Sequence, residues 1–104
     1  MIEAEIFRAL ADPTRRAVFE RLATSEMSVS ELRNGLTVSQ PAVSQHLAVL
    51  KQAGLVSERR EGRFVRYAAR PEGLKPLVDW LGFYATFWAD GFDRMEDLLK
   101  RMDQ

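Results

Sequence analysis

The residues best suited to specific recognition lie along one side of a predicted helix over residues 40–53. At 100° per residue this side carries small, uncharged, hydrogen-bonding side chains, whereas a helix that only meets water usually carries Glu and Lys. A glutamine amide can bond adenine in the DNA major groove, a serine hydroxyl can bond several bases, and small residues allow a close approach. The pattern therefore favours hydrogen bonds to base edges. The candidate residues are Pro41, Ser44 and Gln45 on this side, Gln40 and Lys51 at its boundary, and Ser39 at the cap of the helix.

A second group of candidate residues is basic and surrounds the turn of a predicted β-hairpin. Two strand-like runs, residues 55–60 and 64–69, flank the turn Glu61-Gly62-Arg63. A basic hairpin tip can hold phosphates or enter a minor groove, although charges on an edge strand also protect that edge from pairing. Beside the helix described above, contact with nucleic acid is the favoured interpretation. The arginines concerned are Arg59, Arg60, Arg63 and Arg66.

The net charge of zero hides an uneven distribution along the chain. Residues 1–26 hold four basic and five acidic residues, and residues 27–70 hold seven basic and three acidic ones. Residues 71–104 reverse this balance, with four basic and seven acidic residues. A polyanion is therefore attracted to the middle of the chain and repelled by its C-terminal part.

Enzymatic and metal chemistry find no support in the sequence. No cysteine is present, which excludes a thiolate nucleophile, a disulfide and a thiolate metal site. His46 is the only histidine and lies toward the apolar side of its helix, so we expect a packed ring bonded to the backbone or to a phosphate. No third residue completes a catalytic set with His46 and its neighbouring serines. We therefore expect neither an enzyme nor a cofactor.

The segments that must position these residues follow a defined order. Capping residues and apolar spacing predict helices over residues 2–10, from Asp12-Pro13 to about Ala23, from Ser28 to about Asn34, and over 40–53. A link of about four or five residues between the last two has the spacing of a helix-turn-helix. With the hairpin that follows, this order predicts a mainly helical fold with one small hairpin. It is the winged helix-turn-helix pattern, in a single domain over residues 1–104.

A long C-terminal helix is predicted over residues 74–102. Its apolar residues keep one phase for about seven turns, and neither Gly82 nor Gly91 interrupts that phase, although a kink near Gly91 stays open. Six of the ten aromatic residues lie within residues 80–92. A stripe so rich in aromatics is typical of a subunit interface. The alternatives are a pocket for an apolar small-molecule effector and a surface that binds another protein.

Five sequence motifs point together to one family. They are Ala9–Arg16, Ser28–Leu32, Ser39–Leu47 with Leu50, Gly54–Val56 and Arg60–Arg63. Over about residues 5–70 the sequence resembles the ArsR/SmtB family of bacterial winged-helix repressors. The resemblance makes the 40–53 helix the DNA recognition helix and the 61–63 turn the wing. The part that reads DNA is then about residues 27–70.

The resemblance also implies how the chain assembles and which residues meet the DNA. It implies a homodimer that presents two recognition helices to a palindromic operator on double-stranded DNA. Gln40, Ser44 and Gln45 then face the groove, with Pro41 close by and Arg63 at the wing tip. The first and last helices, about residues 2–10 and 74–102, form the dimer interface. Its expected residues are Ile2, Ile6, Leu77, Trp80, Leu81, Tyr84, Trp88 and Met95.

The chain departs from the founding members of that family in its metal ligands. Those members sense metals through cysteines before the recognition helix, or through Asp and His in the last helix. Here residues 27–32 contain no cysteine and residues 74–104 no histidine. We therefore expect a repressor without a metal. The aromatic-rich C-terminal segment resembles that of members with no known inducer, which repress an operon containing themselves. The alternative is a winged-helix module that binds protein, since the net charge is zero and the 40–53 helix lacks arginine.

Two features bear on where the protein resides. No apolar run approaches the length of about 20 residues that a membrane span needs. The first five residues include two acids where a signal peptide would carry bases. We therefore expect a cytoplasmic protein without contact to a membrane.

Overall fold

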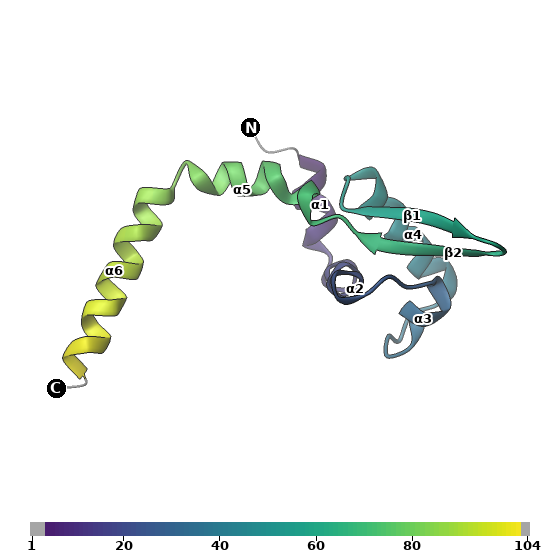
Figure 1. Cartoon of the computed structure of the whole chain (residues 1–104), viewed down its shortest axis with the longest axis horizontal. Coiled ribbons are helices and arrows are strands. Elements are labelled where there is room, and N and C mark those ends of the chain that lie inside the picture. Colours follow the sequence, from purple (N-terminus) through teal and green to yellow (C-terminus); the bar gives the residue numbers. More distant parts are fainter. Residues whose placement is uncertain (1–3, 103–104) are drawn as a thin grey trace.

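Helices and one hairpin make up residues 4–102, the part of the chain that this computed structural model describes (Figure 1). The predicted mainly helical fold with a small hairpin is confirmed. Among these residues no helix combines the length and the apolar character that crossing a membrane requires. In chain order the elements are α1 (Ala4–Ala11), α2 (Pro13–Thr24), α3 (Val29–Arg33), α4 (Gln40–Gln52), β1 (Val56–Glu61), β2 (Phe64–Ala69), the 3-10 helix η1 (Pro71–Leu74), α5 (Lys75–Gly82) and α6 (Ala85–Met102).

Three of the helices begin at the capping residues that the sequence indicates. The Asp12 carboxylate accepts from the backbone N–H of Arg15 at 3.0 Å, at the start of α2. At the start of α3, Ser28 and Glu31 each accept from the other's backbone N–H, at 3.3 and 3.2 Å. The Ser39 hydroxyl accepts from the Ala42 N–H at 3.2 Å. These bonds satisfy N–H groups that have no partner inside their own helix.

The capping carboxylates make stability depend on pH. Hydrogen bonds from the backbone N–H of Arg15 lower the pKa of Asp12 below 3.8, and those from the Ser28 backbone and hydroxyl lower the pKa of Glu31 below 4.5. A carboxyl whose pKa is lower in the folded than in the unfolded state contributes its full stabilisation at pH values above the unfolded-state pKa. That stabilisation is lost as the pH falls through the folded-state pKa. The free energy of unfolding is therefore expected to drop as the pH falls below about 4.5.

Urea unfolding at a series of pH values measures this dependence for the parent and for Glu31→Gln. Glutamine keeps the reciprocal hydrogen bonds of the capping box but does not titrate. The variant is therefore expected to lose part of the acid dependence. Coincident pH profiles for the two proteins would contradict the assignment to Glu31.

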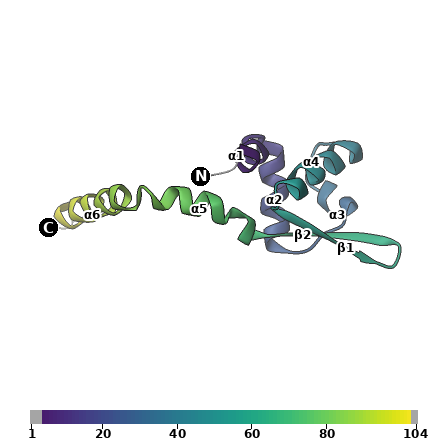
Figure 2. The ribbon, with the colours of Figure 1, turned by 90° about the horizontal axis from the view of Figure 1, so that it is seen from above.

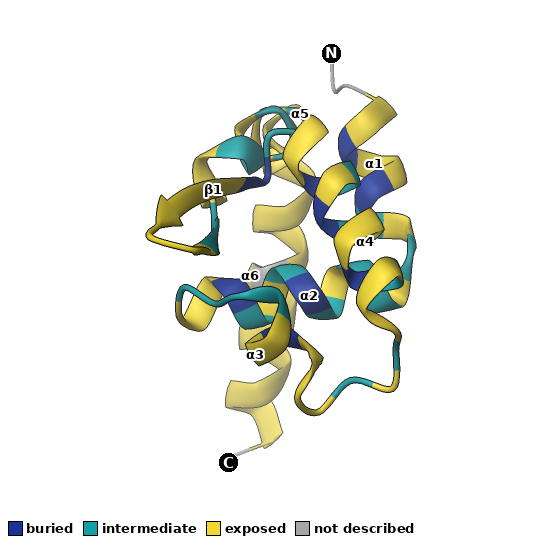
Figure 3. Ribbon diagram, turned by 90° about the vertical axis from the view of Figure 1, so that its right-hand side faces the viewer, coloured by how far each residue is buried: buried dark blue, intermediate teal, exposed yellow. Residues whose placement is uncertain are grey.

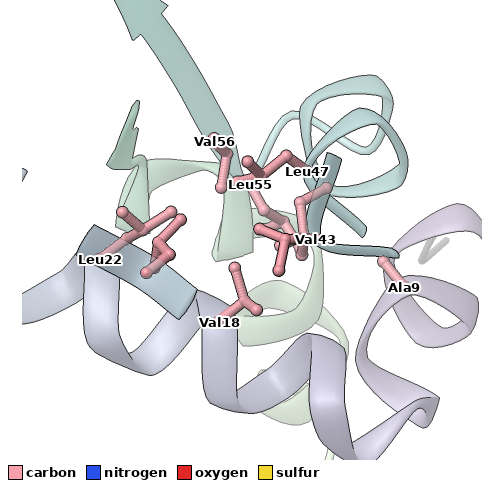
Figure 4. Packing of buried hydrophobic residues seen from close by; sticks show 9 residues of the cluster. Ala9, Val18, Leu22, Val43, Leu47, Leu55 and Val56 are labelled. Carbon is pink, nitrogen blue, oxygen red and sulfur yellow. The ribbon is translucent and has the colours of Figure 1, made fainter. Parts of the chain in front are cut away.

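The core holds α4 against α2 and the start of the hairpin. Figure 4 shows Val18 of α2 pointing toward Val43 of α4, with Leu55 and Val56 alongside. The apolar side of α4 predicted from the sequence is thereby confirmed as the buried one. The full buried cluster consists of Ala9, Val18, Leu22, Leu32, Val43, Leu47, Leu50, Leu55 and Val56.

The hairpin turn is one residue shorter than the sequence predicts. Glu61 pairs with Phe64 as the last rung of the ladder, so Gly62 and Arg63 alone form the turn. Gly62 has φ +62°, a conformation that a two-residue hairpin favours and that glycine adopts without strain. On its other edge, β2 exchanges backbone hydrogen bonds of 3.0 and 2.8 Å between Met27 and Tyr67. The hairpin projects from the body and presents its tip to solvent (Figure 2).

The prediction of one long helix over residues 74–102 is wrong, because the segment forms two helices. The chain bends between α5 and α6, at Phe83 and Tyr84 just after Gly82, and not at Gly91, which lies inside α6 (Figure 1). The Phe83 and Tyr84 N–H groups bond carbonyls three residues back, at 3.2 and 3.0 Å, which tightens and ends α5. Glycine disfavours a helix by about 1 kcal/mol. The apolar phase could not reveal the break, because it records which side is apolar and not whether the backbone is continuous.

The C-terminal segment gives the chain an elongated shape. The radius of gyration is 18.1 Å, whereas a compact chain of this length has about 13 Å. In Figures 1 and 2, α5 runs outward from the body and α6 continues away from it. The apolar side chains of α6 therefore have little of their own chain to pack against.

Candidate nucleic-acid interface

The turn between α3 and α4 is held by a side chain from α2. Arg21 donates to the backbone carbonyl of Asn34 and, at 3.2 Å, to that of Glu31. Both carbonyls lie at the end of α3, where the Asn34 N–H also donates to the Glu31 carbonyl at 3.2 Å. Gly35 then turns the chain with φ +88°. The link, residues 34–39, is slightly longer than predicted, and Arg21 gives it a defined geometry.

The outer side of α4 matches the side that the sequence predicts (Figure 3). Val43, Leu47 and Leu50 are at most 2% exposed and turn inward. The candidate residues Ser39, Gln40, Pro41, Ser44, Gln45 and Lys51 are all exposed. The structure thus brings the candidate hydrogen-bonding groups together on one accessible surface.

Lys51 has a partner that the sequence did not indicate. Its ammonium lies 2.5 Å from a Glu58 carboxylate oxygen, which ties the end of α4 to β1. The hydrogen bond and the charge of Lys51 lower the pKa of Glu58. Burial, with the nearby Glu58 charge, raises the pKa of Tyr67. Lys51 thereby orients the hairpin relative to α4, in addition to any contact with a phosphate.

The four hairpin arginines fall into two pairs. Arg59 is paired with Glu26 and, at 3.2 Å, with Glu61. Arg66 is paired with Glu31 and with Glu61, each at 3.1 Å. Two arginines that the sequence suggested for DNA are thus compensated by acids, two of which come from outside the hairpin. Their role in the structure is to hold the hairpin beside α3.

Arg60 and Arg63 form the other pair. No ion pair joins either of them to an acid within residues 4–102, and both are exposed. Arg63 stands in the two-residue turn itself, and Arg60 lies on the strand next to it, opposite Val65. They are the hairpin cations available to a phosphate.

His46 lies half-buried on α4, and its partner differs from the expected backbone or phosphate. Its Nδ1 accepts from Nε of Arg15, on α2, at 3.5 Å. No group of His, Asp or Glu residues in the described part of the chain is arranged to hold a metal ion. One ring nitrogen of His46 is thus engaged by a side chain of α2.

The predicted interface residues divide between the body and the projecting segment. Trp80 meets Phe7 of α1 edge to face, with ring centroids 5.6 Å apart, and this contact attaches α5 to the body. Ile6 is 2% exposed and packs inside its own chain, Leu77 and Trp80 are half-buried, and Ile2 lies outside the described residues. The exposed members, together with exposed Leu98 and Met102 farther along α6, form what we call the C-terminal apolar face. It consists of Leu81, Tyr84, Trp88, Met95, Leu98 and Met102.

Two hollows lie along the aromatic residues of α5 and α6, where the sequence left an effector pocket open. Both are lined by residues of α5 and α6 and of the link between them alone. They lie open on the C-terminal apolar face. This arrangement suits a broad partner surface better than an enclosed small molecule.

The chain is similar in sequence and in structure to known transcriptional regulators. Residues 12–58 match the family described as bacterial regulatory protein, arsR family. The chain is 46% identical over 91 residues to the HTH-type transcriptional regulator Rv2034 of Mycobacterium tuberculosis, covering 88% of this chain and 85% of that protein. It is 33% identical over 76 residues to the transcriptional repressor SdpR of Bacillus subtilis, covering 73% and 84%. An ArsR-like transcriptional regulator from Rhodococcus sp. RHA1 superposes with a TM-score of 0.72 at 30% identity, covering 91% and 90%.

Proposed function

The chain belongs to the arsR family of bacterial regulatory proteins, and we propose that it is a homodimeric repressor that binds a palindromic operator through α4 and the hairpin tip. Its relatives are DNA-binding transcriptional regulators and not enzymes, and its fold is their winged helix-turn-helix. Similarity to a protein named as a transcriptional repressor supports repression as the outcome. The sequence has no cysteine, so thiolate-based metal sensing has no part in the proposal.

The observation that carries the proposal is the outer side of α4. Gln40, Ser44 and Gln45 are exposed there beside small residues, while the opposite side is buried in the core. Uncharged hydrogen-bonding groups on a firmly seated helix suit base edges in a major groove. Arg60 and Arg63, unpaired within the described residues, suit phosphates or the minor groove next to it.

The C-terminal apolar face supports a dimer. Met95, Leu98 and Met102 are each more than half exposed on a helix that runs away from its own body. In proteins most of a helix's stability comes from packing of its amphipathic face, so we expect α6 to gain stability from a partner surface. A second copy of the chain supplies such a surface and doubles the number of recognition helices, as a palindromic operator requires.

Selection of bound duplexes from a random pool tests the proposal directly. A palindromic motif with half-sites about one helical turn apart is the expected result. Recovery of no motif, with binding that disappears at physiological salt, would leave only non-specific attraction to phosphates. That outcome would favour a winged-helix module that binds protein.

Gln45→Ala and Arg63→Ala are expected to weaken DNA binding in different ways. Loss of a base contact at Gln45 should cost about 1–3 kcal/mol and relax discrimination at one base pair. Loss of a phosphate contact at Arg63 should weaken binding evenly across sequences and reduce the slope of log affinity against log salt by about 1. Titration of the selected duplex and of single-base variants at several salt concentrations separates the two effects. If Gln45→Ala binds every duplex as tightly as the parent does, Gln45 does not contact the DNA bases.

A further inference from the structure

Two neighbouring arginines at the start of α2 hold the end of α1. Nη1 of Arg15 donates to the carbonyls of residues 8 and 9 at 3.2 and 3.4 Å. Nη1 of Arg16 donates to the carbonyls of residues 10 and 11 at 2.6 and 3.4 Å. The last four carbonyls of a helix have no partner in that helix, and here two guanidinium groups bond all four. The end of α1 is therefore tied to the start of α2.

Arg15, unlike Arg16, also reaches α4. Its Nε donates to Nδ1 of His46, and its Nη2 lies 3.9 Å from the Asp12 carboxylate that caps α2. The Arg15 side chain is only 15% exposed, whereas Arg16 is exposed and makes no such contact among the described residues. One guanidinium therefore touches three helices, which lie side by side in Figure 3.

The position of His46 on α4 makes this contact relevant to DNA. His46 lies between exposed Gln45 and buried Leu47, at the boundary between the outer and inner sides of the helix. A bond at this boundary opposes rotation of α4 about its own axis. The planar guanidinium has donors in a fixed geometry, so it restrains the angle between the helices and not just their separation.

At its other end, Arg15 is connected to the surface proposed for dimerisation. The carbonyls that it bonds belong to α1, and Phe7 of α1 packs on Trp80 of α5. Contacts thus run from α5 through α1 and Arg15 to His46 on α4. In a dimer the two recognition helices must meet successive grooves about one helical turn apart, so their angle to the dimer interface matters.

We propose that Arg15 and His46 are positioning residues that set the angle of α4 relative to α1. This inference rests on the proposed function, because it assumes that α4 binds DNA from within a dimer. The geometry of the dimer interface then determines where Gln45 meets the DNA. Neither Arg15 nor His46 needs to touch the DNA for this role.

Arg16→Ala provides a matched control for Arg15→Ala. Each variant removes a guanidinium that bonds two α1 carbonyls, but Arg15→Ala alone breaks the contact to α4. With the duplex selected from the random pool, Arg15→Ala is expected to lower affinity about tenfold at an unchanged dimer fraction, and Arg16→Ala less than about twofold. Equal losses of affinity in the two variants would overturn the inference.

Substitutions at His46 test the contact from the other side. Asparagine places an acceptor oxygen close to the position of Nδ1, so His46→Asn is expected to retain most of the affinity. His46→Leu removes the acceptor and should lose as much affinity as Arg15→Ala. Since both changes break one contact, the double variant should bind about as well as either single variant. Additive losses would show that the two residues act separately.

Nitrogen NMR of the histidine ring gives a readout that does not depend on DNA. The chain has one histidine, so the ring signals need no assignment. At a pH where the ring is neutral, the parent and Arg16→Ala should show Nδ1 as the acceptor and the proton on Nε2, whereas Arg15→Ala should give a mixture of tautomers. Unchanged ring signals in Arg15→Ala would overturn the inference. If the parent protein binds no duplex, the proposed function is wrong together with this inference. If the parent and Arg15→Ala bind the duplex equally well, this inference alone is wrong.

Discussion

Replacing Trp88 with aspartate is expected to convert the proposed dimer into monomers. Trp88 is half exposed in the middle of the C-terminal apolar face. Its ring packs edge to face on that of Phe87, with ring centroids 6.1 Å apart. Buried aromatic residues dominate the binding energy of interfaces, and a charge in their place is left unpaired on association. The dimer should weaken by about 2–4 kcal/mol, a rise of roughly 30- to 1,000-fold in its dissociation constant.

Sedimentation velocity over a range of concentrations measures this change. Thr86→Asp adds the same charge two residues away, on the polar side of α6, and should leave the dimer intact. The monomeric Trp88→Asp should also lose its preference for a palindrome over a single half-site, because only one recognition helix is then available. If Trp88→Asp and Thr86→Asp sediment alike, the C-terminal apolar face is not the interface between copies.

Replacing Gly73 with alanine is expected to destabilise the fold by roughly 2–4 kcal/mol. Gly73 lies in η1, against the turn that leads from α4 into β1. A Cβ there would lie 2.0 Å from the carbonyl oxygen of Gly54 and 2.9 Å from its carbonyl carbon. These are backbone atoms, which cannot rotate away as a side chain can. Either η1 or the end of α4 must therefore move.

Urea unfolding of Gly73→Ala, beside Gly82→Ala, measures the cost of this crowding. A Cβ at Gly82 would meet nothing within 4 Å, and alanine favours a helix over glycine by about 1 kcal/mol. Gly82→Ala should therefore equal or exceed the parent in stability. If Gly73→Ala is as stable as the parent, η1 does not pack on the α4–β1 turn in solution.

The DNA-facing side of α4 is the part of the candidate site that the sequence predicts best. The spacing of Val43, Leu47 and Leu50 identifies the buried side, so the exposed position of Ser44 and Gln45 follows without the fold. The sequence predicts less well which hairpin arginines are paired with acids. Arg59 and Arg66 look equivalent to Arg63 in the sequence, yet acids at Glu26 and Glu31 compensate them.

The C-terminal helix shows a different limit. Periodicity identified the apolar side of residues 74–102, and the exposed Met95 and Leu98 lie on it. It missed the bend after Gly82 because the residues on both sides of the bend keep the same phase. Inside a compact chain, packing would set the path of such a segment. Here α6 leaves the body, and α5 ends after Gly82 although Gly91, with the same low helix propensity, lies unbroken inside α6.

The sequence by itself determined where α2, α3 and α4 begin and which side α4 buries. Asp12, the Ser28–Glu31 pair and Ser39 act on backbone groups at most three residues away, so their effect depends on local spacing alone. Only the tertiary structure decided the contacts of Arg15 with His46, Arg59 with Glu26 and Arg66 with Glu31, whose partners are 31, 33 and 35 residues apart. Residues so distant meet only after the hydrophobic core has packed their elements together. No local preference of the chain specifies such meetings, so the geometry that orients α4 and the hairpin is a property of the folded structure.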